Sequence, residues 1–188
     1  GSGSFLIGAF GYLLDSITAY YGKYPREAKK NTLKTDADGT IHLSLRLKRE
    51  ILVNCVYGID IDPQAVEVAQ LSLYLKLMEE ETTYSAHQQQ LEIGAALLPS
   101  LSANIVVGNS LVNPEGGDLF SIQRLRETKA IDYKSEFPQI FKSGGFDLVI
   151  GNPPYIKEYT NRDAFEHIRT SQYYEGKMDI WYMFACAA

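Results

Sequence analysis

Residues 56–77 read VYGIDIDPQAVEVAQLSLYLKL and predict a strand that leads directly into a helix. The first six residues form a short apolar run bounded by charge, which is typical of a buried parallel strand. Asp62 suits the N-cap of the helix and Pro63 its first position, and we expect the helix to continue to about Glu81. A strand, a tight turn and a helix in this order are the repeating unit of a doubly wound α/β sheet.

The segments on either side continue this alternation. Apolar residues recur at helical spacing near both ends of the chain, and two more short apolar runs have the character of buried strands. The predicted fold class is therefore α/β, a doubly wound Rossmann-like sheet. The predicted helices cover residues 5–21, 41–52, part of 113–145 and 177–188, and the further strands cover residues 104–107 and 146–150.

The two ends of the sequence lack parts that such a sheet needs. The chain begins on GSGS, whereas a doubly wound fold delivers a central strand into its glycine loop. It ends inside an apolar helix. We therefore expect one partial domain over residues 1–188, without its first strand and its C-terminal strands. Its insertions are expected at about residues 22–50, which are loop-rich as far as residue 39, and at about residues 113–144.

Composition excludes several classes of protein. The chain has 188 residues and a net charge of −5, which argues against a free-standing nucleic-acid clamp, because such clamps depend on basic residues. We expect no membrane span and no signal peptide, and hence a cytoplasmic protein. Cys55 and Cys186 are predicted to be buried thiols, and no metal site is expected because the three histidines are scattered. Residues 79–81 are predicted to be a solvated helix end.

The strongest chemical signal is the tetrapeptide Asn152, Pro153, Pro154 and Tyr155, directly after the predicted strand at 146–150. Two prolines fix two φ angles and remove two N–H donors, so the loop is stiff and its carbonyl groups can act as acceptors. The carboxyl end of a strand is where open α/β sheets bind ligands. This arrangement favours binding of a planar amine. The amide oxygen and a carbonyl oxygen can accept hydrogen bonds from its amino group, and the aromatic ring can stack on the attached ring.

Four blocks in order resemble the adenine-N6 DNA methyltransferases of bacterial restriction–modification systems, in the large type II (type IIG-like) forms where modification and restriction share a polypeptide. The blocks are GSGSFLIGAF, VYGIDIDPQAVEVAQLSLYLKL, VVGNSL and FDLVIGNPPYI, and the later YYEGKMDIWYMF is also similar. The resemblance implies methyl transfer from S-adenosylmethionine to the N6 amino group of a flipped-out adenine. The resemblance also implies that the tetrapeptide Asn152, Pro153, Pro154 and Tyr155 is the catalytic motif. Asn152 and Pro153 would accept hydrogen bonds from the amino group, and Tyr155 would stack on the base.

The resemblance also implies a set of cofactor-binding residues. Glycines allow the backbone to approach the methionine part of the cofactor, and an acidic residue at a strand end accepts hydrogen bonds from the ribose hydroxyls. The apolar residue after it would lie against the adenine ring, and the asparagine would read the edge of that ring. These residues are Gly1, Ser2 and Gly3 for the loop, Asp60 and Ile61 after the strand at 56–61, and Asn109 with Ser110 beside it.

The implied partner is double-stranded DNA, bound through a target-recognition domain outside this chain, and the longer protein of this family can carry a nuclease. We expect the fragment alone to be inactive and its open strand edges to favour dimers. Alternative interpretations stay open: a methyltransferase acting on protein glutamine or RNA, a nicotinamide-dependent oxidoreductase, and a non-enzymatic scaffold derived from a methyltransferase.

Overall fold

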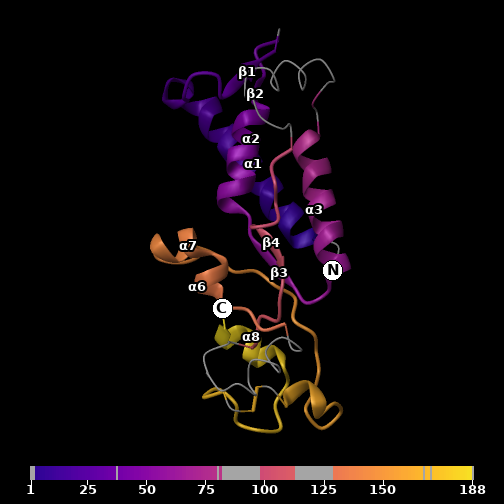
Figure 1. Ribbon diagram of the computed structural model, residues 1–188. Coiled ribbons are helices and arrows are strands. Elements are labelled where there is room, and N and C mark those ends of the chain that lie inside the picture. Colours follow the sequence, from indigo (N-terminus) through magenta and orange to yellow (C-terminus); the bar gives the residue numbers. More distant parts are fainter. Residues whose placement is uncertain are drawn as a thin grey trace. The chain divides into compact units, whose positions relative to one another are not determined.

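The computed structural model describes residues 3–36, 38–79, 81, 98–112, 129–166, 168–169 and 171–187. These residues belong to two compact units (Figure 1). Unit 1 comprises Gly1–Gly58 and Pro63–Val106, and unit 2 comprises Ile59–Asp62 and Val107–Ala188. The structure is mixed α/β with small sheets, in agreement with the predicted class.

Unit 1 is built on three helices, α1 (Ser4–Lys23), α2 (Leu45–Cys55) and α3 (Pro63–Met78), which pack side by side (Figure 1). Its core is aliphatic apart from one phenylalanine, and seven of its twelve buried residues come from α2 and α3. The buried core consists of Phe10, Leu43, Leu45, Ile51, Leu52, Val56, Val66, Ala69, Leu73, Leu77, Leu101 and Ile105.

Helix α3 begins at Pro63 as predicted, and it buries one apolar stripe, which consists of Val66, Ala69, Leu73 and Leu77. Three further apolar residues of α3 lie outside this stripe. Val68, Leu71 and Leu75 are 46%, 58% and 66% exposed. They lie about half a turn away from the buried stripe, on the opposite face of the helix, because successive residues of a helix are spaced by about 100°.

A β-hairpin precedes α2, where the sequence predicted only loop and helix. Strand β1 (Leu33–Thr35) pairs antiparallel with β2 (Ile41–Leu43), and the connecting turn places Gly39 at φ 89°. The predicted helix over residues 41–52 therefore starts too early. The Ser44 side chain accepts a hydrogen bond from the Leu47 N–H, which caps α2 and makes it begin at Leu45.

Strands β3 (Gly58–Asp60) and β4 (Ile105–Val107) form the second small sheet. The Gly58 N–H donates to the Asn104 carbonyl and the Gly108 N–H donates to the Asp60 carbonyl, each at 2.9 Å, so the two strands run in the same direction. This is the parallel pairing that the strand–helix alternation predicted. Buried Asn104 supports it, because its amide donates to the carbonyls of Val53 and Val56 at the end of α2.

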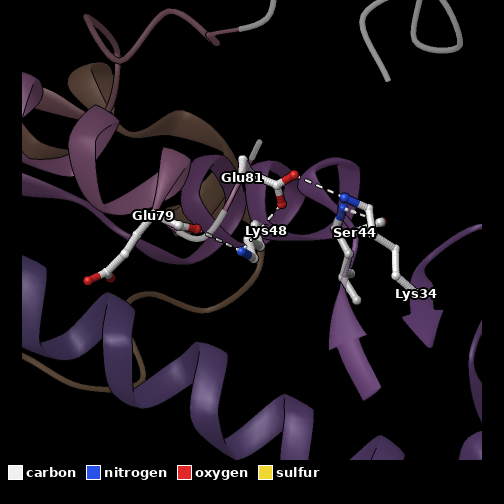
Figure 2. Close-up of polar contacts among 6 residues, drawn as sticks. Lys34, Ser44, Lys48, Glu79 and Glu81 are labelled. Carbon is white, nitrogen blue, oxygen red and sulfur yellow. Dashed lines mark hydrogen bonds and ion pairs between the residues drawn. The ribbon is translucent and has the colours of Figure 1, made fainter. Parts of the chain in front are cut away.

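The segment just after α3 is only in part the solvated helix end that was predicted, since the Glu79 side chain is exposed but Glu81 forms a buried ion pair (Figure 2). The Glu81 side chain is only 4% exposed, and its two oxygens lie 2.9 Å from Lys34 Nζ and 3.4 Å from Lys48 Nζ. Lys48 also donates to the Glu79 carbonyl at 3.3 Å. Glu81 therefore links the hairpin, α2 and the end of α3, while residue 80 lies outside the described residues.

Unit 2 contains short elements: α6 (Tyr133–Glu136), α7 (Pro138–Lys142), η2 (Asp163–Phe165) and α8 (Trp181–Ala187). Its core is small and apolar, and partly buried side chains such as Ile156 and Tyr174 pack against it. The buried members are Phe165, Ile168, Ile180 and Met183. The predicted final helix is shorter than expected, since α8 begins only at Trp181.

Two further expectations are corrected. Residues 146–150 are not a strand, and Leu148, Val149 and Ile150 are 76%, 53% and 44% exposed. A strand is stable only beside a partner, and the described residues place none along this segment.

Cys55 and Cys186 form no disulfide but are exposed rather than buried. None of the helices in the described ranges has the length and hydropathy of a membrane span.

Candidate functional site

Asp60 and Asn109 are brought to the same edge of the small parallel sheet, at the carboxyl ends of β3 and β4. The Asp60 carbonyl accepts from Gly108, the residue just before Asn109. The Asp60 carboxylate accepts from the Asp62 N–H at 3.0 Å, which shapes the turn into α3. Asp60 and Asn109, two of the residues that the resemblance assigned to the cofactor, therefore lie on neighbouring strand ends, in the place where open α/β sheets bind ligands.

Ile61 lies beside this edge and is 54% exposed, which is unusual for an isoleucine. Its backbone is held in place, because Lys129 Nζ donates to the Ile61 carbonyl at 2.8 Å. An exposed apolar side chain on a fixed backbone next to a carboxylate suits one face of a planar, ribose-linked ring.

Asn109 and Ser110 are fixed by contacts from the chain after residue 128. The Asn109 N–H donates to the Lys129 carbonyl at 2.8 Å, and the Tyr133 hydroxyl donates to the Ser110 carbonyl at 2.8 Å. Burial raises the pKa of the Tyr133 phenol, so this hydroxyl stays protonated as a donor. The Asn109 side-chain oxygen accepts from the Leu111 N–H at 3.0 Å, and its Nδ2 group is the donor end.

Gly108, Lys129 and Tyr133 were not identified from the sequence as parts of this edge. A Cβ added to Gly108 would lie 2.8 Å from the Ile131 side chain, so the glycine allows the close approach of residues 129–133. The glycine just before Asn109 was the one available signal. Lys129 and Tyr133 carry no motif, and only the folded chain brings them here.

The tetrapeptide lies in unit 2 and is presented to the outside. Asn152 and Pro154 are exposed and Tyr155 is 79% exposed, whereas the next residue, Ile156, packs against the unit 2 core. The Ile180 N–H donates to the Ile156 carbonyl at 2.9 Å. The exposed Tyr155 ring is therefore directly followed by a residue that is packed and hydrogen-bonded, and the Asn152 amide lies three residues before it.

Gly3 belongs to unit 1, whereas the other described site residues belong to unit 2. It has φ 73° at the start of α1, and an added Cβ would lie 2.7 Å from Ala69 Cβ of α3. Both observations require glycine. They give Gly3 a packing role within unit 1, whereas Gly1 and Ser2 lie outside the described residues. In the part of the chain that is described, no three His, Cys, Asp or Glu side chains are grouped to hold a metal.

Comparison with known proteins places these features in a family. The family model of the Eco57I restriction-modification methylase matches residues 54–188. The type II restriction enzyme and methyltransferase RM.Eco57I of Escherichia coli is 36% identical over 156 residues, which are 83% of this chain and 14% of that protein. A putative enzyme of the same description from Methanocaldococcus jannaschii, RM.MjaORFECS2P, is 36% identical over 112 residues, 60% of this chain and 8% of that protein.

The adenine-specific methyltransferase PglX of Streptomyces coelicolor is 28% identical over 164 residues, which are 83% of this chain and 12% of that protein. The chain thus spans a small part of the length of the curated relatives it matches. No solved structure matches it. The family model covers more than half of the chain, including Asp60, Asn109 and the tetrapeptide. The chain therefore belongs to the Eco57I restriction-modification methylase family.

Proposed function

We propose that the chain is the catalytic part of an enzyme that methylates the N6 amino group of adenine in double-stranded DNA, within a restriction–modification system. The observation that carries the proposal is the exposed tetrapeptide, with Tyr155 79% exposed on a segment whose next residue is packed into a core. An aromatic side chain so exposed is available to stack on a base. Of the relatives, one is named an adenine-specific methyltransferase and two are named restriction enzymes and methyltransferases.

S-adenosylmethionine fits the edge formed by Asp60, Ile61 and Asn109, and when bound it supplies an electrophilic methyl group. The fit rests on the chemistry of these side chains. The Asp60 carboxylate can accept hydrogen bonds from the ribose hydroxyls, and the exposed Ile61 side chain can pack against the face of the adenine ring. Because the Asn109 oxygen already accepts from Leu111, we assign its Nδ2 to donate to a ring nitrogen. The underlying fold is proposed to be the doubly wound methyltransferase sheet, of which β3 and β4 are one parallel pair.

The tetrapeptide acts on the amino group of the target base. The Asn152 side-chain oxygen and the Pro153 carbonyl accept its two N–H bonds, which draws the nitrogen toward tetrahedral geometry and makes its lone pair available. Tyr155 stacks on the base, a contact worth about 1–3 kcal/mol per base. The chemistry then depends on positioning and on a polarised nucleophile. Recognition of a DNA sequence is assigned to a domain outside this chain, and a nuclease to the remainder of the longer protein.

The test is to replace Asn152 in the full-length protein. Asn152→Ala should lower the rate of methyl transfer by at least about a hundredfold, because it removes a hydrogen bond made to the reacting group. Binding of S-adenosylmethionine should change little, since Asn152 is not among the residues assigned to hold the cofactor. Asn54→Ala, an exposed asparagine in α2, is the matched control and should behave as the wild type. Full methylation by the Asn152 variant would contradict the proposed role.

Stabilisation against thermal unfolding by a ligand distinguishes a methyltransferase from a nicotinamide-dependent oxidoreductase. S-adenosylmethionine should raise the melting temperature of the protein, because a ligand that binds only the folded state stabilises it. Protection by NAD, with none by S-adenosylmethionine, would favour the oxidoreductase instead.

A further inference from the structure

We propose that Glu158 is a positioning residue, whose carboxylate holds the chain after Tyr155 against residues 174–180 and so orients the tetrapeptide. The inference rests on the proposed function. Glu158 follows Tyr155 by three residues and lies in no motif that the sequence identified. Its side chain is 12% exposed, so this carboxylate is largely removed from water.

The segment around Glu158 is paired with the segment around Met178. The Glu158 N–H donates to the Met178 carbonyl at 3.1 Å, and the Ile180 N–H donates to the Ile156 carbonyl at 2.9 Å. Between these bonds, Lys157 and Asp179 form an antiparallel bridge. Residues 156–158 therefore take their direction from residues 178–180.

The carboxylate of Glu158 strengthens this pairing with three donors. The Tyr174 hydroxyl donates to Oε1, Arg169 Nη2 lies 3.3 Å from Oε1, and the Lys177 N–H donates to Oε2 at 2.7 Å. Lys177 has φ 52° and follows Gly176 at φ 78°, so two consecutive residues are left-handed. A lysine in this conformation is costly and persists only where its surroundings hold it, and the Glu158 carboxylate supplies such a contact.

The pairing decides which way the residues of the tetrapeptide loop point. Side chains alternate along an extended segment, and Ile156 is packed against the unit 2 core while Tyr155 is 79% exposed. If residues 156–158 shift, the Tyr155 ring and the Asn152 amide shift with them. A displacement of about 1 Å in a reacting group can cost about a hundredfold in rate.

A carboxylate is needed because all three partners are donors. Replacing it by an amide removes the charge opposite Arg169 and brings an NH₂ group toward one of the other donors. That donor then loses its acceptor, although the side chain keeps its shape. Glu158→Gln is therefore a sharper variant than a truncation.

The experiment uses the full-length protein with duplex DNA and S-adenosylmethionine. Glu158→Gln should lower kcat at least about tenfold, while KM for DNA and the dissociation constant of S-adenosylmethionine stay within about twofold. Glu175→Gln, a neighbouring exposed carboxylate, is the control and should match the wild type. Tyr174→Phe removes only one donor and should lower kcat by less. The two changes together should cost less than the product of their separate effects, because they remove one shared contact.

Hydrogen exchange separates this inference from the proposed function. In Glu158→Gln, the amides of Glu158, Lys177 and Ile180 should exchange faster than in the wild type, whether or not any methyl transfer is measured. If the wild type methylates adenine and the variant keeps its kcat, the positioning role is wrong and the proposed function stands. If the wild type does not methylate adenine, the proposed function is wrong. Unchanged amide exchange in the variant would show that Glu158 does not hold residues 156–158 against residues 174–180, and would overturn this inference.

Discussion

Replacing Glu81 by Gln should destabilise the protein by about 3 kcal/mol. The side chains of Glu81 and Lys48 are 4% and 9% exposed, and removing one partner of such a buried pair costs about 3–5 kcal/mol. Lys34 adds little, because its side chain is 36% exposed and pairs of this kind contribute about 0–1 kcal/mol. The bond from Lys48 to the Glu79 carbonyl remains in the variant and keeps the cost near the lower end of the range.

Urea unfolding followed by far-UV circular dichroism measures this loss, since α1, α2 and α3 contain most of the helical residues in the described part of the chain. Glu50→Gln breaks an exposed pair with Arg46 and should cost at most about 0.5 kcal/mol. Lys48→Met combined with Glu81→Gln should be more stable than the sum of the two changes predicts, because neither charge is then left alone. A loss below about 1 kcal/mol for Glu81→Gln, or strict additivity, would refute the buried pair.

Three further predictions concern unit 2. Gly108→Ala should lower the free energy of unfolding by about 1–3 kcal/mol, because its Cβ would lie 2.8 Å from the Ile131 side chain. Gly8→Ala in α1 is the control and should instead stabilise the protein by about 0.5–1 kcal/mol, because the space around Gly8 is open. Equal effects of the two changes would contradict the close packing of Gly108 against Ile131. Tyr155→Ala should lower kcat/KM on DNA roughly five- to 150-fold without loss of stability, whereas Tyr159→Ala, also exposed, should not. The pKa of Glu158 is lowered from 4.5 by the Tyr174 hydroxyl first, and by the Lys177 N–H and Arg169. Its contribution to stability should therefore be complete above pH 4.5 and be lost as the pH falls through the lowered pKa, and Glu158→Gln should remove this part of the acid dependence of the urea midpoint.

Local patterns predicted the elements that depend on local chemistry. The helix at Pro63, the strand before it and the strand at Ile105 follow from a capping turn and from short apolar runs, and all three are present. The edge at Asp60 and Asn109 could be predicted for the same reason, because the carboxyl ends of parallel strands meet at one side of a sheet.

Features that depend on distant partners were not predictable in this way. Glu81 looks like a solvated helix end until Lys34, 47 residues away, is placed beside it. Residues 146–150 have the apolar character of a strand, but a strand also needs a neighbour to accept and donate its backbone hydrogen bonds. Lys129, Tyr133 and Glu158 act through their positions in the folded chain, and nothing in their own sequence marks them.

The most direct test of the account is the identity of the methylated product. The full-length protein is incubated with labelled S-adenosylmethionine and with duplex DNA, RNA and a glutamine peptide in separate reactions, and the products are digested and separated. We predict N6-methyladenine from duplex DNA, with no label in RNA or peptide, and none from DNA in the Asn152→Ala variant. Label on glutamine or RNA, or on a base other than adenine, would contradict the proposed function.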